Sequence, residues 1–150
     1  MAYWFRRLKK GARPLKWSRL EWKWFLHFFF KAWLLFFSSK LSYRHLKVRL
    51  ISAMSAPVEP VPDRVQPVLL AYQRVFRWMW VPRNCLRDAL LLHEGLLQHQ
   101  VSTRLIIGVT TQNQFKAHAW LVGQDGPLLQ NAEHIAEYVE FNGDFSQWMA

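Results

Sequence analysis

The chain has 150 residues, of which 51% are hydrophobic, and a formal net charge of +10. A chain of this length buries about two-thirds of its unfolded surface, which is enough for one hydrophobic core. Its single cysteine excludes an internal disulfide and a thiolate-rich zinc site, and it fits a reducing cytoplasm. Five of the six histidines show no metal-ligand spacing, so the sequence predicts neither a metal nor a cofactor.

Positive charge is concentrated in the N-terminal half of the chain. Residues 1–84 carry 17 Lys/Arg and 3 Asp/Glu, a net of +14, whereas residues 85–150 carry 3 and 7, a net of −4. Such a basic region suits an acidic peptide, a partner protein, anionic lipid or nucleic acid, and a solvated basic face is the simplest alternative. No nucleic-acid-binding motif is recognisable, so nucleic acid is not expected as a partner.

Two helices are expected at the start, over about residues 16–38 and 40–54. Residues 24–37 are the most apolar stretch, but fourteen residues that include His27 and Lys31 fall short of the roughly twenty that a spanning helix needs. They also lack the features of a secretory signal. Trp and Phe beside Lys and Arg favour either peripheral membrane contact or a docking face for a partner protein. We therefore expect residues 1–56 to form a basic, aromatic-rich helical lobe of a cytoplasmic protein, with membrane association as the alternative.

A proline-rich linker, residues 57–62, is expected to separate this lobe from a core of residues 63–150, because prolines cannot continue a helix. In the core, Asp63 begins a helix that runs to about Trp80, where Pro82 ends it, and a second helix runs from Cys85 to about Gln98. The expected buried face of the second helix is Leu86, Ala89, Leu90, Leu96 and Leu97. Strands are expected at 103–110, 117–122 and 128–130, with a turn at 124–127, a short helix near 132–138 and a last strand near 139–141.

The only cysteine, Cys85, lies where a nucleophile would be expected. It follows a candidate N-cap, Asn84, so free N–H groups and the positive end of the helix dipole favour a thiolate. His118 comes thirty-three residues later on a predicted strand, and Asn131 ends the next apolar stretch. This order is typical of papain- or transglutaminase-like thiol enzymes. Taken singly, a small buried cysteine and a structural histidine are the simpler interpretations.

Three sequence blocks stand in a fixed order: NCLRDAL at 84–90, VSTRLIIGV at 101–109 and AHAW at 117–120. Over about residues 76–131 they resemble the transglutaminase-like core of lasso-peptide leader peptidases, in the split form in which the peptidase stands alone. The resemblance implies an α+β fold, in which a helix bearing Cys85 packs against a small antiparallel sheet, after an N-terminal helical lobe.

The same resemblance implies a cysteine peptidase that removes the leader from a ribosomally made lasso precursor. Cys85 would be the nucleophile and His118 the base and acid, with Asn131 as the third member and Trp120 as a candidate substrate contact. The implied partners are the precursor's leader, a separate leader-binding protein and the ATP-dependent lasso cyclase, and the basic lobe would dock one of them. Two alternatives stay open: another acyl transferase of the transglutaminase superfamily, and a non-catalytic basic adaptor that binds membrane or nucleic acid.

The third catalytic position depends on the alignment of one hairpin. The family's catalytic Asp falls on Asn131 if the turn glycine, Gly126, is aligned and one extra residue is allowed in the hairpin. Without that extra residue the position is Gln130, and Asp125 is a further alternative. The family's V-E after the Trp is also replaced, by Leu121 and Val122. An asparagine can orient an imidazole, but it cannot stabilise an imidazolium by charge.

Overall fold

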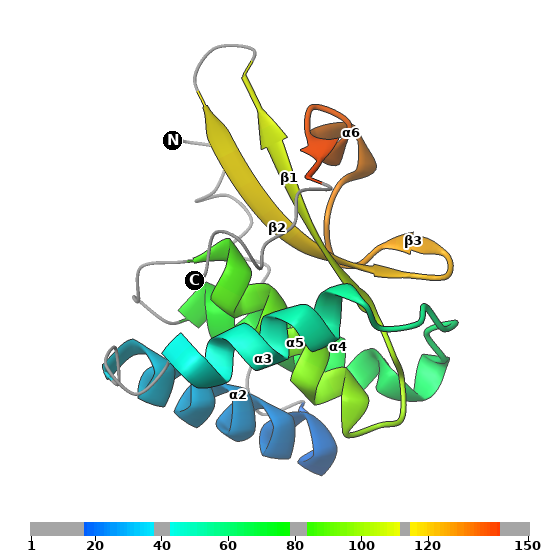
Figure 1. The fold of residues 1–150 in the computed structure, drawn as a ribbon. Helices are drawn as coiled ribbons and strands as arrows, with labels where there is room; N and C mark the ends of the chain where they lie inside the picture. Colours follow the sequence, from blue (N-terminus) through cyan, green and yellow to red (C-terminus); the bar gives the residue numbers. More distant parts are fainter. Residues whose placement is uncertain (1–16, 38–42, 79–83, 112–114, 142–150) are drawn as a thin grey trace, which may run out of the picture.

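The computed structural model describes residues 17–37, 43–78, 84–111 and 115–141. A layer of helices lies against one side of a small sheet (Figure 1), so the expected α+β architecture is confirmed. The helices are α2 (Arg19–Phe37), α3 (Tyr43–Met54), the 3-10 turn η2 (Asp63–Val65), α4 (Gln66–Trp78), α5 (Cys85–Leu97) and α6 (Ala132–Ile135). The strands are β1 (Arg104–Thr110), β2 (Lys116–Gly123), β3 (Gly126–Pro127) and β4 (Val139–Glu140).

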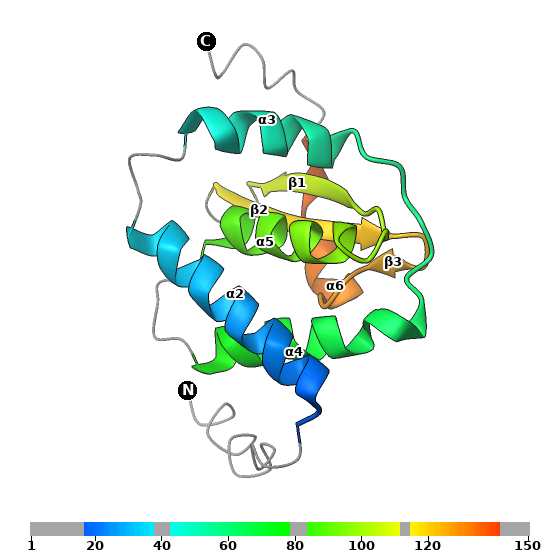
Figure 2. The ribbon, with the colours of Figure 1, turned by 90° about the horizontal axis from the view of Figure 1, so that it is seen from below.

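The sheet is antiparallel throughout, with the strand order β3-β2-β1-β4. In its central pair, Ile106 faces Trp120 and Gly108 faces His118. Alternate residues of the same strands, among them Leu105 and Leu121, join the hydrophobic core. Seen from below, α5 runs in front of β2, with β1 beside it (Figure 2). One face of the sheet is therefore covered by the helix that begins at Cys85.

The N-terminal helices belong to the same core as the rest of the described chain. Trp24 and Phe28 of α2 and Leu50 of α3 cluster with side chains from α4, α5 and the sheet. The proline-rich segment, residues 57–62, is also held against the sheet by backbone hydrogen bonds. The Glu59 N–H donates to the Ser102 carbonyl at 3.1 Å, and the Glu59 carbonyl accepts from the Gln124 N–H at 3.1 Å. The segment thus runs along the start of β1 and the β2–β3 turn.

A capping box begins α2. The Ser18 hydroxyl accepts from the Glu21 N–H at 3.1 Å, and the Glu21 carboxylate accepts from the Ser18 N–H at 2.7 Å. Arg74 of α4 donates to the same carboxylate at 2.6 Å. The bond from the Ser18 N–H, and then Arg74, lower the pKa of Glu21 despite its partial burial. The only acidic residue of α2 is therefore held ionised against α4.

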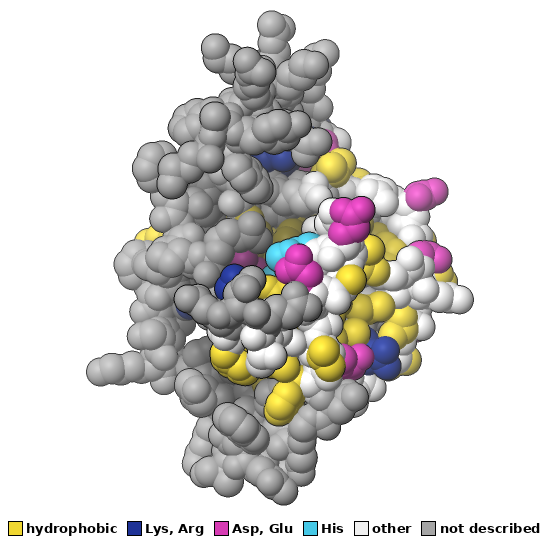
Figure 3. All heavy atoms as spheres, turned by 90° about the horizontal axis from the view of Figure 1, so that it is seen from above, with side chains coloured by type: hydrophobic (Ala, Val, Ile, Leu, Met, Phe, Trp, Pro, Cys, Tyr) yellow, Lys and Arg dark blue, Asp and Glu magenta, His cyan; other side chains and the backbone are white. Residues whose placement is uncertain are grey.

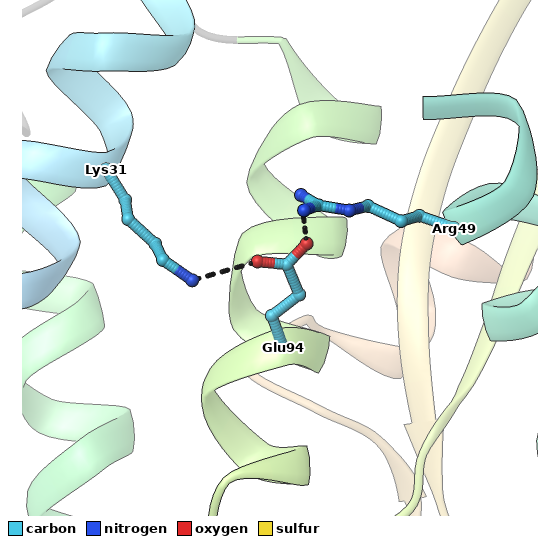
Figure 4. Close-up of polar contacts among 3 residues, drawn as sticks. All are labelled: Lys31, Arg49 and Glu94. Carbon is cyan, nitrogen blue, oxygen red and sulfur yellow. Dashed lines mark hydrogen bonds and ion pairs between the residues drawn. The ribbon is translucent and has the colours of Figure 1, made fainter. Parts of the chain in front are cut away.

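A second carboxylate joins three helices (Figure 4). Glu94 of α5 pairs with Lys31 of α2 at 3.1 Å and with Arg49 of α3 at 2.7 Å. Arg49 is more than half exposed, so its pair is screened by solvent and stabilises the fold only modestly. The arrangement explains the lysine inside the apolar stretch, because Lys31 lies at the edge of α2 that meets α5.

Several expected boundaries are wrong in detail. Leu97 is 46% exposed, because α5 ends there and Leu96 takes the core position. Residues 128–130 form bends rather than a strand, because Leu129 has a left-handed φ of 57°. Strand β3 falls instead on Gly126–Pro127, inside the expected turn. The helix expected over 132–138 ends at Ile135. Pro82, the expected end of the preceding helix, lies outside the described residues.

Acid should destabilise the fold through His93. This side chain is 4% exposed, its Nδ1 lies 3.0 Å from the Thr103 hydroxyl, and burial lowers its pKa below the ordinary 6.5. The unfolded chain then binds a proton more readily than the folded one, so stability should fall as the pH drops below about 6.5 and return above it. Urea unfolding midpoints across this range should show the slope, and His93→Gln should reduce it. Burial lowers the pKa of His27 as well, so part of the slope should remain. An unchanged slope in His93→Gln would contradict the assignment.

Candidate active site

A pocket of about 810 Å³ lies where α4 and α5 meet the sheet. Its walls come from one face of α4, the first two turns of α5, the middle of β2 and residues 128–130. Cys85 and His118, which the sequence singles out as nucleophile and base, both line it. The structure thus brings the two central residues of the predicted site to one pocket. Figure 3 shows the molecule from above, where acidic side chains lie next to a histidine on the surface.

The start of α5 places Cys85 in its first turn, as predicted. The Asn84 side chain accepts from the Arg87 N–H at 3.2 Å, which confirms Asn84 as the N-cap. The Asn84 carbonyl accepts from the Asp88 N–H at 2.9 Å. The N–H groups of the first helical turn have no carbonyl partner within the helix, so those of Cys85 and Leu86 suit an oxyanion. Cys85 itself is a free, half-buried thiol.

The His118 ring lies among aromatic side chains. It is nearly parallel to the Trp120 ring, with centroids 5.9 Å apart and planes at 21°. The centroids of Tyr138 and His134 lie 5.5 Å and 5.8 Å away. Trp120 is only 5% exposed, so it forms a fixed wall on one side of the imidazole. The alternation of side chains along the strand correctly predicts that Trp120 packs beside His118.

Gly108 makes room for this arrangement. A Cβ atom at this position would lie 2.7 Å from Cη2 of Trp120 and 2.9 Å from Cβ of Tyr138. Both distances are shorter than any ordinary carbon–carbon contact. The glycine directly opposite His118 in the strand pair therefore allows Trp120 and Tyr138 to approach the sheet. No sequence pattern indicated Tyr138, because it comes from the distant segment after α6.

Asp88 also lines the pocket, although the sequence did not single it out. It lies three residues after Cys85, one turn along the same helix face, and is 9% exposed. The Tyr72 hydroxyl donates to the Asp88 backbone carbonyl at 2.9 Å and so ties α4 to α5 at the pocket wall. The i, i+3 spacing from the candidate nucleophile is the signal that would have revealed this residue.

The three candidates for the third catalytic position lie in different surroundings. Asn131 is exposed and caps α6, where its side-chain oxygen accepts from the Glu133 N–H at 3.1 Å. Asp125 is exposed in the β2–β3 turn. Gln130 lines the pocket, next to the left-handed backbone of Leu129. The geometry therefore favours Gln130 as the side chain at the pocket, whereas the alignment with the family favours Asn131.

Alanine substitutions at the two neighbouring positions should separate these roles. We expect Gln130→Ala to lower turnover, because the pocket loses a polar side chain that can orient the imidazole. Asn131→Ala should chiefly cost stability, by about 1 kcal/mol, because a helix loses its cap. Turnover and the free energy of unfolding should be measured for both variants. A larger loss of turnover in folded Asn131→Ala would restore Asn131 as the third catalytic residue.

The described residues bring together no group of three or more His, Cys, Asp and Glu side chains suited to a metal ion. They do place a helix-borne thiol and a strand-borne imidazole in the lining of one pocket, and these are the two groups that a thiol acyl-transfer enzyme needs.

Comparison with protein families agrees with this class. The family model of the Transglutaminase-like superfamily matches residues 32–142. The match covers most of the chain, so this protein belongs to the transglutaminase-like superfamily, which includes cysteine peptidases and acyltransferases. Searches among curated proteins and among solved structures gave no match.

Proposed function

We propose that this protein is a cysteine peptidase that removes the leader from a lasso-peptide precursor through a thioester at Cys85. The observation that carries the proposal is the shared pocket of Cys85 and His118. It occurs in a chain of the transglutaminase-like superfamily whose three motif blocks resemble split leader peptidases.

The chemistry follows from the two side chains. His118 accepts the proton of the Cys85 thiol, and the sulfur attacks the carbonyl carbon of the bond between leader and core. N–H groups in the first turn of α5 stabilise the oxyanion of the tetrahedral intermediate. His118 then gives the proton to the leaving amine of the core peptide, while the leader stays on sulfur as a thioester. Water, activated by His118, hydrolyses the thioester and restores the thiol.

The pocket suits an extended peptide with mixed side chains. Phe76 and Leu128 supply apolar wall, whereas Gln73, Arg77 and Asp88 supply polar groups. Trp120 is the candidate wall for the residue beside the scissile bond. In this scheme a separate leader-binding protein delivers the precursor, and an ATP-dependent cyclase takes the freed core.

The proposal is tested with the precursor peptide encoded beside this protein. The peptide is incubated with the full-length chain, with and without the leader-binding protein, and the products are identified by mass spectrometry. Hydrolysis predicts a leader ending in a free carboxylate and a core with a free amine. A leader joined to an added amine would instead assign the protein to the acyltransferases of the superfamily. An intact precursor under all conditions, with Cys85 inert to thiol reagents, would favour a non-catalytic adaptor.

A further inference from the structure

The outer face of α2 exposes a row of large apolar side chains. Four of its large side chains are between 39% and 58% exposed: Trp22, Leu26, Phe30 and Leu34. At 3.6 residues per turn these four positions fall on one side of the helix. The other side buries Trp24 and Phe28 in the core. An exposed apolar strip of this length on one helix indicates an interaction surface.

The charges on this face are positive. Arg19 and Lys23 are exposed on the same side of the helix as the apolar strip. The only acidic residue of α2, Glu21, is turned to α4, where it pairs with Arg74 and is 13% exposed. Residues 1–16, which precede the helix, contain six Lys/Arg and no Asp or Glu. The apolar strip is therefore combined with cations whose charge the described carboxylates of α2 do not neutralise.

Helix α2 is also the outermost layer of the molecule. It lies across α4 on the side of the helices that faces away from the sheet (Figures 1 and 2). A flat surface can meet this side without covering the sheet face on which Trp120 and His118 lie. At about 1.5 Å per residue, the 19 residues of the helix would lie along such a surface for nearly 30 Å.

We propose that α2 attaches this protein to an anionic bilayer, lying flat in the interface. Trp, Phe and Leu side chains enter the boundary between headgroups and acyl chains, while Arg19 and Lys23 pair with lipid phosphates. Charge complementarity favours lipid, because this face presents cations beside bulky apolar groups. None of the described helices is long and apolar enough to cross a membrane, so the attachment is peripheral.

Vesicle flotation with the full-length protein tests the proposal. The protein should float with vesicles of phosphatidylcholine and phosphatidylglycerol, but not with phosphatidylcholine alone. Phe30→Ser should weaken the binding about tenfold, because one large apolar side chain no longer enters the interface. Phe115→Ser is the matched control: Phe115 is 74% exposed, precedes β2 and lies away from α2, so its loss should leave binding unchanged.

The contribution of positive charge to vesicle binding is tested by the same flotation assay. Lys23→Gln should weaken binding to the anionic vesicles about fivefold, whereas Lys116→Gln, an exposed lysine on β2, should have no effect. Equal binding to neutral and anionic vesicles, or unchanged binding by Phe30→Ser, would overturn the proposal. So would a wild-type protein that ignores vesicles and forms, in light scattering, a dimer that Phe30→Ser dissociates, because the face would then bind a second copy.

Discussion

Replacing His118 with alanine should lower the rate of precursor cleavage by about a thousandfold or more. His118 lines the pocket that Cys85 also lines, and the proposed chemistry uses it twice, to take the thiol proton and to protonate the leaving amine. Residues that act as one unit lose nearly all of their effect when any member is removed. Initial rates at saturating precursor, followed by mass spectrometry, give the comparison with the wild type.

His134 provides a matched control. Its ring centroid lies 5.8 Å from that of His118, but its side chain is exposed and is not part of the pocket wall. His134→Ala removes an imidazole from the same cluster, so we expect less than about a tenfold loss of rate. If both variants lose activity equally, the loss comes from disturbed packing around Trp120 and Tyr138 rather than from proton transfer.

The elements nearest the site could be predicted because their signals are local. Asn84 before an apolar run predicts a helix that starts at Cys85, and the structure begins α5 there, with Asn84 as its N-cap. The alternation in 117–122 predicts a strand that carries His118 and Trp120 on one face. Caps and side-chain periodicity act within a few residues, so they can be recognised without knowledge of the tertiary fold.

Other features depend on contacts between distant segments. Position 108 suits glycine because the side chains of Trp120 and Tyr138 occupy the space that a Cβ atom would need. Tyr138 comes thirty residues later in the chain. The left-handed residue Leu129 is neither Gly nor Asn, so nothing in the sequence marked the bend that replaces the expected strand. This bend directly precedes Gln130 and Asn131, which with Asp125 are the alternatives for the proposed third catalytic position. Local sequence signals therefore do not decide which of these side chains lies at the pocket.

Long-range packing also determines how the N-terminal helices join the rest of the fold. The sequence suggests a basic lobe ahead of a linker, but Lys31 and Arg49 meet on Glu94 of α5, and Phe28 is fully buried in the common core. Composition alone cannot show which aromatic side chains of α2 face inward and which face outward. The structure divides them, with Trp24 and Phe28 inside and Phe30 and Trp33 outside.

Cys85→Ala should abolish cleavage while the fold persists. The substitution removes one sulfur atom from a half-buried position at the start of α5, and alanine is a good helix former. We expect the free energy of unfolding to change by no more than about 1 kcal/mol. The thioester, in contrast, cannot form without the thiol, and no other cysteine can replace it in this chain.

The most direct test is a parallel cleavage assay with wild-type protein and Cys85→Ala, each with the same precursor and leader-binding protein. Urea unfolding of both proteins first establishes that the variant is folded. We predict that free leader and free core are formed only by the wild type. Equal amounts of both products from a folded Cys85→Ala protein would contradict the assignment of Cys85 as the nucleophile, and with it the proposed peptidase activity.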